Sequence, residues 1–274
     1  MKKLTLATAI LAATTSLAMI NANAYQFEVG AGAGYLDPDN GDSGSQFDLG
    51  GTYYFNPVQD KNAPLAEAAF VNRASNVSAG ATFQDQGEAE NNRYGAGVEY
   101  YVPNSDFYIG GNIAQNTYEY DDVDLDNDLT TYGVEVGYLP VPNLLIAAGV
   151  KGYEDDRDND GVDPTLRAKY VTQIGDNAVN LEAGAAFGDL DEYNLAADYY
   201  IDNTFSLGAD YQSNDITDNS EFGVNARKFI SQQTSLEGRV GFGEAGDNDY
   251  NTFGIAAKHP LKIAHFIKQV QTDF

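Results

Sequence analysis

The 274-residue sequence contains no cysteine, no tryptophan and only two histidines. Without cysteine, the chain can form neither a disulfide framework nor a thiolate metal site. The two histidines, His259 and His265, are too few for a histidine metal cluster. No glycine-flanked serine or phosphate-binding loop accompanies them. We therefore expect no enzymatic activity.

Basic residues are also scarce. The chain has 15 Lys and Arg against 41 Asp and Glu, which gives a formal net charge of −26. Nucleic-acid binding needs Lys and Arg to neutralise phosphates, so this composition excludes a nucleic-acid partner. Disorder is disfavoured too, because 43% of the residues are hydrophobic and they recur in a regular pattern.

A long apolar run is found only at the N-terminus. Lys2 and Lys3 precede the stretch from Leu4 to Ile20, and Ala22-Asn23-Ala24 follows as a small-residue cleavage site. This is the pattern of a secretory signal peptide over residues 1–24. An uncleaved anchor is the alternative, but hydroxyl residues interrupt the apolar stretch and favour cleavage. We expect export through the secretory pathway.

After the leader, apolar and polar residues alternate in runs that are separated by turn residues. In one run, for example, Tyr193, Leu195 and Ala197 alternate with polar or small residues. Scoring this alternation gives candidate strands at 25–35, 45–55, 75–84, 92–102, 106–117, 128–139, 143–154, 164–174, 178–188, 191–201, 204–213, 219–229, 234–244 and 248–258. Each is close to the ~9–11 residues with which a tilted strand crosses hydrocarbon. The sequence therefore predicts an all-β fold: a transmembrane antiparallel β-barrel of about 14 strands (12–16) over residues 25–258.

Two kinds of connection alternate between these strands. Short ones, such as Pro103-Asn104-Ser105 and Asp202-Asn203, consist of turn formers. Longer, acidic ones include Tyr118 to Asp128 and Tyr153 to Asp163. Outer-membrane barrels have short periplasmic turns and longer extracellular loops. We therefore expect short periplasmic turns, longer acidic extracellular loops, and both termini in the periplasm.

Tyrosine pairs precede several of the short turns. Tyr53-Tyr54, Tyr100-Tyr101 and Tyr199-Tyr200 each place two aromatic residues at consecutive positions of a strand. Successive side chains of a strand point to opposite faces of the sheet. One tyrosine of each pair should therefore face lipid at headgroup depth, and the other the lumen.

The connection over residues 56–76 is long although it falls on the short-turn side. Pro64 stands at a plausible first helical position, and Leu65, Glu67 and Phe70 lie in the stretch of helix formers that follows. One interpretation is a packed, partly helical periplasmic cap. The other is a candidate gate segment that folds into the lumen and narrows the pore.

Several segments near the N-terminus match a known family. They are Tyr25-Gln26-Phe27-Glu28-Val29, Gly51-Thr52-Tyr53-Tyr54-Phe55, the stretch from Ala63 to Phe70, and Ala74-Ser75-Asn76-Val77-Ser78. These segments resemble the porins of Gram-negative outer membranes, Acinetobacter type. The resemblance implies a monomeric barrel of about fourteen strands that acts as a passive, narrow channel for water and small solutes. It carries over no functional residue.

The C-terminal end departs from such barrels, which usually close on a terminal aromatic residue. Residues 251–258 fit a last strand, but His259-Pro260-Leu261 and a further stretch to Phe274 follow. Proline lacks the N–H that a ladder needs, so Pro260 is expected to interrupt pairing with the first strand. We therefore expect the barrel to end at residue 258, with 259–274 as an atypical tail.

Charged residues fall at the positions that alternate with the apolar ones, so they would line the lumen. These pore-lining candidates are Arg93, Glu99, Glu135, Arg167, Lys169, Glu182, Asp198, Asp210, Arg227, Glu237 and Arg239, with Lys258 in the last strand. Opposed acidic and basic walls would create a transverse field that orients polar solutes. Alternatively, the charges pair across the interior and stiffen or block it. The acidic mouths favour cations.

One acidic stretch resembles half of a calcium loop. Asp156, Asp158 and Asp160 alternate before Gly161, but the position of the closing glutamate is occupied by Arg167. A solvated acidic loop is one interpretation, and weak Ca²⁺ or Mg²⁺ binding is the other. A similar acidic run spans residues 122–128. We expect no other cofactor.

These observations predict an outer-membrane porin that passes water, ions and small polar solutes through a narrow charged lumen. A plugged or structural barrel that serves as a surface adhesin is the alternative, and a soluble acidic β-protein of the periplasm is a third hypothesis. The expected partners are outer-membrane lipid and lipopolysaccharide, the barrel assembly machinery and small polar solutes. The chain is expected to be a monomer.

Overall fold

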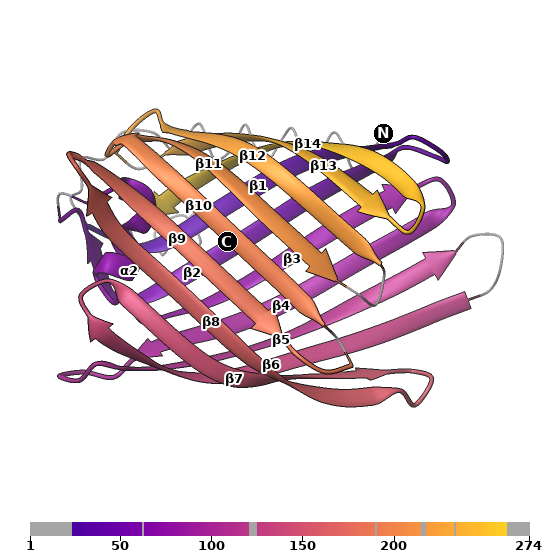
Figure 1. Ribbon diagram of the computed structural model, residues 1–274, viewed down its shortest axis with the longest axis horizontal. Coiled ribbons are helices and arrows are strands. Elements are labelled where there is room, and N and C mark those ends of the chain that lie inside the picture. Colours follow the sequence, from indigo (N-terminus) through magenta and orange to yellow (C-terminus); the bar gives the residue numbers. More distant parts are fainter. Residues whose placement is uncertain are drawn as a thin grey trace, which may run out of the picture.

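The computed structural model describes residues 24–61, 63–120, 125–189, 191–214, 218–232 and 234–261. These residues form a closed antiparallel barrel in which each strand pairs with its neighbours in sequence and the last strand pairs with the first (Figure 1). The predicted signal peptide up to residue 23, residues 122 and 124 of the second acidic run, and the tail from residue 262 onward lie outside the described residues.

The predicted strands are all present. They are β1 (Ala24–Pro38), β2 (Gly44–Gln59), β3 (Asn76–Gln86), β4 (Ala89–Tyr101), β5 (Phe107–Tyr120), β6 (Leu125–Val141), β7 (Leu144–Asp155), β8 (Asp160–Ile174), β9 (Asn177–Ala186), β10 (Glu192–Asp202), β11 (Phe205–Asn214), β12 (Asn219–Phe229), β13 (Ser235–Ala245) and β14 (Asn248–Leu261). A 3₁₀ turn, η1 (Leu65–Glu67), and a short helix, α2 (Ala68–Val71), lie between β2 and β3. No helix in the described part of the chain is long and apolar enough to cross a bilayer.

The outer face of the barrel is covered by apolar side chains. Val136 on β6 is 66% exposed, Leu195 on β10 is 54% exposed and Ile255 on β14 is 58% exposed. Side chains alternate between the two faces of a strand, so the residues between them point inward. Apolar side chains are thus exposed around the whole barrel wall. Such a face is expected where the wall contacts the hydrocarbon of a bilayer.

The tyrosine pairs divide between the two faces as predicted. Tyr100 and Tyr199 are exposed on the outer face, whereas Tyr54, Tyr101 and Tyr200 are buried within the barrel. All of them lie near the end of the barrel where β1 begins and β14 ends, which we call the terminal rim. We call the opposite end the distal rim.

At the distal rim the strands extend into stretches that the sequence assigned to loops. β5 continues to Tyr120 and β6 begins at Leu125, while β7 continues to Asp155 and β8 begins at Asp160. Most of both acidic stretches is therefore strand. Beyond the apolar band both faces of a hairpin meet water, so the ladder continues without the alternation that reveals a strand in the sequence.

The last strand also extends beyond its predicted end at residue 258. β14 continues to Leu261, and Pro260 lies opposite Glu28 of β1. Pairing of β13 with β14 ends where Ser235 meets Lys258, so Pro260 has a strand neighbour on one side only. Proline is tolerated at such an edge position. The expectation that Pro260 interrupts the ladder was wrong, and the barrel includes residues 259–261.

Candidate functional site

The connection between β2 and β3 folds into a compact segment within the terminal rim, visible beside the α2 label in Figure 1. We call residues 60–75 the crossing segment. Backbone N–H groups of Asn72 and Arg73 donate to the carbonyls of Ala68 and Phe70, at 3.0 and 2.8 Å, and close the short helix. Arg73 adopts a left-handed φ of 50°, which ends the helix and turns the chain back toward β3.

This segment spans the mouth of the barrel. It leaves the wall after β2, and the backbone N–H of Leu65 donates to the carbonyl of Asn203 at 2.9 Å. Asn203 lies between β10 and β11, on the far side of the closed strand order from β2 and β3. The chain therefore reaches across the lumen before it returns to start β3.

A buried carboxylate fixes the segment to the far wall. Glu67 is 4% exposed. Its Oε1 accepts a hydrogen bond from the Tyr200 hydroxyl at 2.7 Å, and its Oε2 lies 2.9 Å from Nζ of Lys169. Lys169 also contacts Glu182 at 2.7 Å. Burying a carboxylate is costly unless it is paired and hydrogen-bonded, and Glu67 meets both conditions.

Apolar contacts fix the segment elsewhere. Phe70 packs against a buried cluster on the β4–β7 wall, which consists of Tyr101, Tyr108, Leu139 and Leu145. Ala68 and Ala74 pack against Tyr54 and Val58 of β2. Of the predicted gate residues, Leu65, Glu67 and Phe70 thus make specific contacts inside the barrel, and Pro64 immediately precedes them. The segment is packed, as expected for a periplasmic cap. It also crosses the lumen, as expected for a gate segment.

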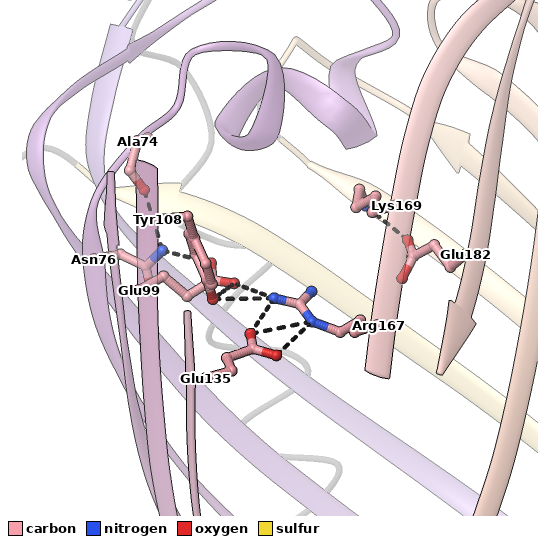
Figure 2. Close-up of polar contacts among 8 residues, drawn as sticks. All are labelled: Ala74, Asn76, Glu99, Tyr108, Glu135, Arg167, Lys169 and Glu182. Carbon is pink, nitrogen blue, oxygen red and sulfur yellow. Dashed lines mark hydrogen bonds and ion pairs between the residues drawn. The ribbon is translucent and has the colours of Figure 1, made fainter. Parts of the chain in front are cut away.

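A second polar cluster crosses the interior on the lumen side of this segment, below the helix in Figure 2. Nη2 of Arg167 on β8 lies 2.5 Å from Oε1 of Glu135 on β6, 3.0 Å from the hydroxyl of Tyr108 on β5, and 3.8 Å from Glu99 on β4. β8 pairs only with β7 and β9. These side chains can meet only through the lumen, so Arg167, Glu135 and Glu99 all face inward.

Hydrogen bonds link this cluster to the crossing segment. The Tyr108 hydroxyl donates to Oε1 of Glu99 at 3.1 Å. Nδ2 of Asn76 donates to Oε2 of Glu99 at 3.0 Å and to the carbonyl of Ala74, the end of the segment, at 3.1 Å. Figure 2 shows this chain of contacts from Arg167 to Ala74. Hydrogen bonds therefore join the Arg167 cluster to the end of the crossing segment.

The other predicted lumen charges form ion pairs along the wall. Arg227 lies 2.6 Å from Glu237. Arg239 contacts both Asp210 and Glu221, the latter at 2.5 Å. Among the remaining candidates, Asp198 accepts a hydrogen bond from Asn180, Arg93 donates to Asn116, and Lys258 has no ion-pair partner within the described ranges.

Open space remains beside these pairs. Cavities of about 830, 480 and 780 Å³ follow one another through the barrel. The first two share Glu28, Arg93 and Lys258 in their linings, and the second and third share Asp48. Water-accessible spaces thus lie in series along the lumen from the crossing segment to the distal rim, with lining residues shared between neighbours.

Residues 1–161 match the family described as “Putative general bacterial porin”. The chain belongs to this porin family. The crystal structure of the Acinetobacter baumannii outer membrane protein Omp33 is similar, with a TM-score of 0.63 and 27% identity over 87% of this chain and 99% of that one. The CymD monoaromatic hydrocarbon channel shares the fold, with a TM-score of 0.52 and 9% identity over 87% of this chain and 89% of that one. No curated protein matches the sequence.

The family and its structural relatives place this porin in the outer membrane of a Gram-negative bacterium. The apolar outer face is therefore its contact with lipid. They also indicate a channel rather than an enzyme.

Several residues of the porin's lumen were not predicted. Lys151 and Glu192 form an ion pair at 2.6 Å, and Glu221 shares Arg239 with Asp210. Each occupies an inward position of its strand, so the alternation that identified the other charges could have identified these. The inner tyrosines were predicted to face the lumen, but their role as anchors was not: Tyr200 bonds to Glu67, and Tyr54 and Tyr101 contact the segment's apolar side.

The acidic hairpin between β7 and β8 contains the predicted cation ligands. Within the described residues, no group of three or more histidine, aspartate or glutamate side chains is placed to hold a metal ion. Asp155 organises the turn instead: its Oδ1 accepts the backbone N–H groups of Arg157 and Asn159, each at 2.9 Å. Asp158 adopts a left-handed φ of 63°. Asp156 and Asp158 thus lie in a tight turn and Asp160 begins β8, and the three are not grouped as a metal site.

Proposed function

We propose that this porin is a passive diffusion channel for water, ions and small polar solutes. The series of lumen cavities is the observation that carries the proposal. A barrel with a dry, packed interior would be a structural element, whereas charged and hydrogen-bonding side chains line these spaces throughout. The pairs of Arg227 and Arg239 lie along the wall, the Arg167 cluster crosses part of the interior, and open space remains beside both.

The crossing segment sets the size limit. It holds Glu67 and Phe70 within the terminal rim by contacts with Lys169, Tyr200 and the β4–β7 cluster. A narrow opening at this level excludes large solutes while water and small ions pass. The terminal rim faces the periplasm in this proposal, because the short turns and both chain ends lie on that side of such barrels.

The lumen favours cations. Arg167, Lys169 and Arg239 each contact two carboxylates, so each group retains a formal negative charge. Negative charges along a narrow path lower the energy of a cation more than that of an anion. The transverse field between separate acidic and basic walls is correspondingly weak.

The partners of the proposed channel follow from its two faces. Outer-membrane lipid and lipopolysaccharide contact the outer face, and the barrel assembly machinery inserts the chain. Small polar solutes are the cargo of the lumen. The apolar face is continuous around the barrel, as a monomer in lipid requires.

Single-channel recording in planar bilayers tests the proposal. We expect the parent porin to pass a steady ohmic current. A variant in which a two-residue Asn-Gly hairpin turn replaces residues 60–73 should conduct severalfold more, because the terminal rim is cleared. In the matched control, the same turn replaces Gly175 and Asp176 between β8 and β9 and leaves the crossing segment intact, and the conductance should stay near that of the parent.

The outcomes separate the possible functions. If neither the parent nor the shortened variant conducts, the porin is a plugged or structural barrel and the channel function is refuted. If both conduct equally, the channel function stands and the crossing segment does not set its width.

A further inference from the structure

The crossing segment is fixed to only part of the barrel wall. It packs on β2 through Ala68, on β4–β7 through Phe70, and on β8–β10 through Glu67. A backbone hydrogen bond from Leu65 to Asn203 ends this series of contacts. Beyond these anchors lies the arc formed by β12, β13, β14 and β1, of which Tyr25 on β1 packs against the cluster that contains Ala68 and Ala74.

A separate cavity of about 160 Å³ lies between the segment and that arc. The segment contributes Leu65 and Ala66 to its lining, and the wall contributes Arg227 and Lys258. A single water needs roughly 10–15 Å³ of such space, so several waters fit. Elsewhere the segment meets the wall through apolar packing, the buried pair of Glu67 with Lys169, and the exposed pair of Arg73 with Asp106. A cavity of about 600 Å³ lies beside Arg73, but it shares only Tyr101 with the linings of the lumen cavities described above.

The cavity reaches from the terminal rim to the main lumen. Gln232, in the connection between β12 and β13, lies at its rim end. Glu28 and Lys258 line both this cavity and the two larger cavities above it. The spaces on the two sides of the segment therefore meet at these two residues.

We propose that this side passage, bounded by the crossing segment and the arc from β12 to β1, is the permeation route while the segment stays docked. The inference rests on the proposed channel function and adds the route. The cargo of the route is water and small monovalent ions, because the passage holds only a short file of waters. Displacement of the segment is not needed for this basal flow.

Lys258 is the specificity-determining residue of the passage. Arg227 is paired with Glu237 at 2.6 Å, whereas Lys258 has no ion-pair partner among the described residues. Its ammonium group lies where all three cavities meet, together with the Glu28 carboxylate, with which it forms no ion pair in the described part of the chain. It opposes cation entry and moderates the preference that the acidic clusters impose.

Cysteine accessibility tests the route, because the chain has no cysteine of its own. Gln232→Cys places one thiol at the rim end of the passage, and Gln173→Cys makes the same substitution at an exposed position of the same rim on β8. A trimethylammonium-ethyl methanethiosulfonate reagent is added from the terminal-rim side of a bilayer. We expect the current of the Gln232→Cys porin to fall to less than half, and that of the Gln173→Cys porin to stay unchanged. An equal loss of current in both variants, or no loss of current in either, overturns the proposed route.

A disulfide that holds the crossing segment in place distinguishes flow through the side passage from flow that requires the segment to move. Leu65→Cys with Asn203→Cys joins positions whose backbones already share a hydrogen bond, and a free-thiol assay verifies the disulfide. Current that persists after oxidation supports the side passage. Current that disappears after oxidation and returns with reductant overturns it, because flow then requires the segment to move.

Charge reversal tests the role of Lys258. Under a salt gradient, Lys258→Glu should raise the cation-to-anion permeability ratio severalfold, with Lys258→Met intermediate. Lys228→Glu is the matched control, since Lys228 lies exposed near the rim beside Asp202 and outside the passage lining. An unchanged ratio in Lys258→Glu overturns the assignment. A parent porin without any current would refute the channel function itself, which is a distinct result.

Discussion

The two halves of the barrel wall share one outer face but differ inside. From β1 to β4 the inner positions are often glycine; Gly30, Gly50, Gly80 and Gly95 all line one cavity. We call this wall the glycine arc. From β7 to β13 the inner positions carry the ion pairs of Lys151, Lys169, Arg227 and Arg239, and we call this wall the charged arc.

The difference shows that lipid contact and pore chemistry are specified independently. Alternation sends apolar residues outward on both arcs, and only the inward positions distinguish them. At the glycines of this arc there is no side chain to fill the lumen, so open space lies against them. At Gly50 the nearest atom to an added Cβ is 3.8 Å away, so its neighbours leave room for a side chain. Long paired side chains stiffen the opposite wall.

The largest effect is expected from breaking the charged arc at its centre. Arg239→Met leaves Asp210 and Glu221 close together without their shared cation. Glu221 is almost fully buried. We expect the free energy of unfolding, measured by urea titration in lipid vesicles, to fall by about 1–2 kcal/mol after allowance for water in the lumen. Neutralising the carboxylates as well, with Asp210→Asn and Glu221→Gln, should restore most of the loss. No recovery would mean that the arginine stabilises by packing alone.

A smaller effect is expected from filling the glycine arc. Gly50→Leu should roughly halve the single-channel conductance, because the new side chain projects into the central cavity. Stability should change little, since the site has room. Ala197→Leu adds the same volume on the outer face and should leave the conductance unchanged. Equal conductance of Gly50→Leu and the parent would show that the current does not pass along the glycine arc.

The smallest effect is expected at an ion pair of the charged arc that, unlike the Arg239 cluster, contains no buried carboxylate. Lys151→Met removes the ion pair with Glu192. The side chain of Lys151 is 27% exposed and that of Glu192 is 30% exposed. Such pairs contribute little, so we expect a loss of about 0.5 kcal/mol or less in the same urea titration. A loss as large as that of Arg239→Met would show that all parts of the charged arc contribute equally to stability.

Most of the fold could be predicted from local sequence pattern. Period-two alternation located every strand, and β12 coincides with its predicted range of 219–229. The tyrosine pairs were assigned correctly to the two faces. The ends of the strands were less predictable, because apolar and polar residues alternate only where one face of the strand contacts lipid. The distal hairpins extend beyond lipid, and Pro260 pairs at a position with a single neighbour.

The partners of the lumen charges could not be predicted. Arg167 contacts Glu135 and Glu99 across the interior, from strands that do not pair with its own. Which residues meet there depends on the stagger of the closed barrel, which no single segment of sequence contains. The same applies to Glu67 and Tyr200, which lie 133 positions apart. The local sequence pattern indicated that these side chains face inward. Closure of the barrel determined which partner each side chain contacts.

The large separation in sequence between the crossing segment and its anchors has a consequence for biogenesis. The segment is synthesised early, yet Lys169 and Tyr200 belong to strands, and Asn203 to a turn, that follow it by about 100 residues or more in the sequence. Its docking can be completed only when the second half of the wall has been added. A docked crossing segment therefore indicates that the barrel has closed.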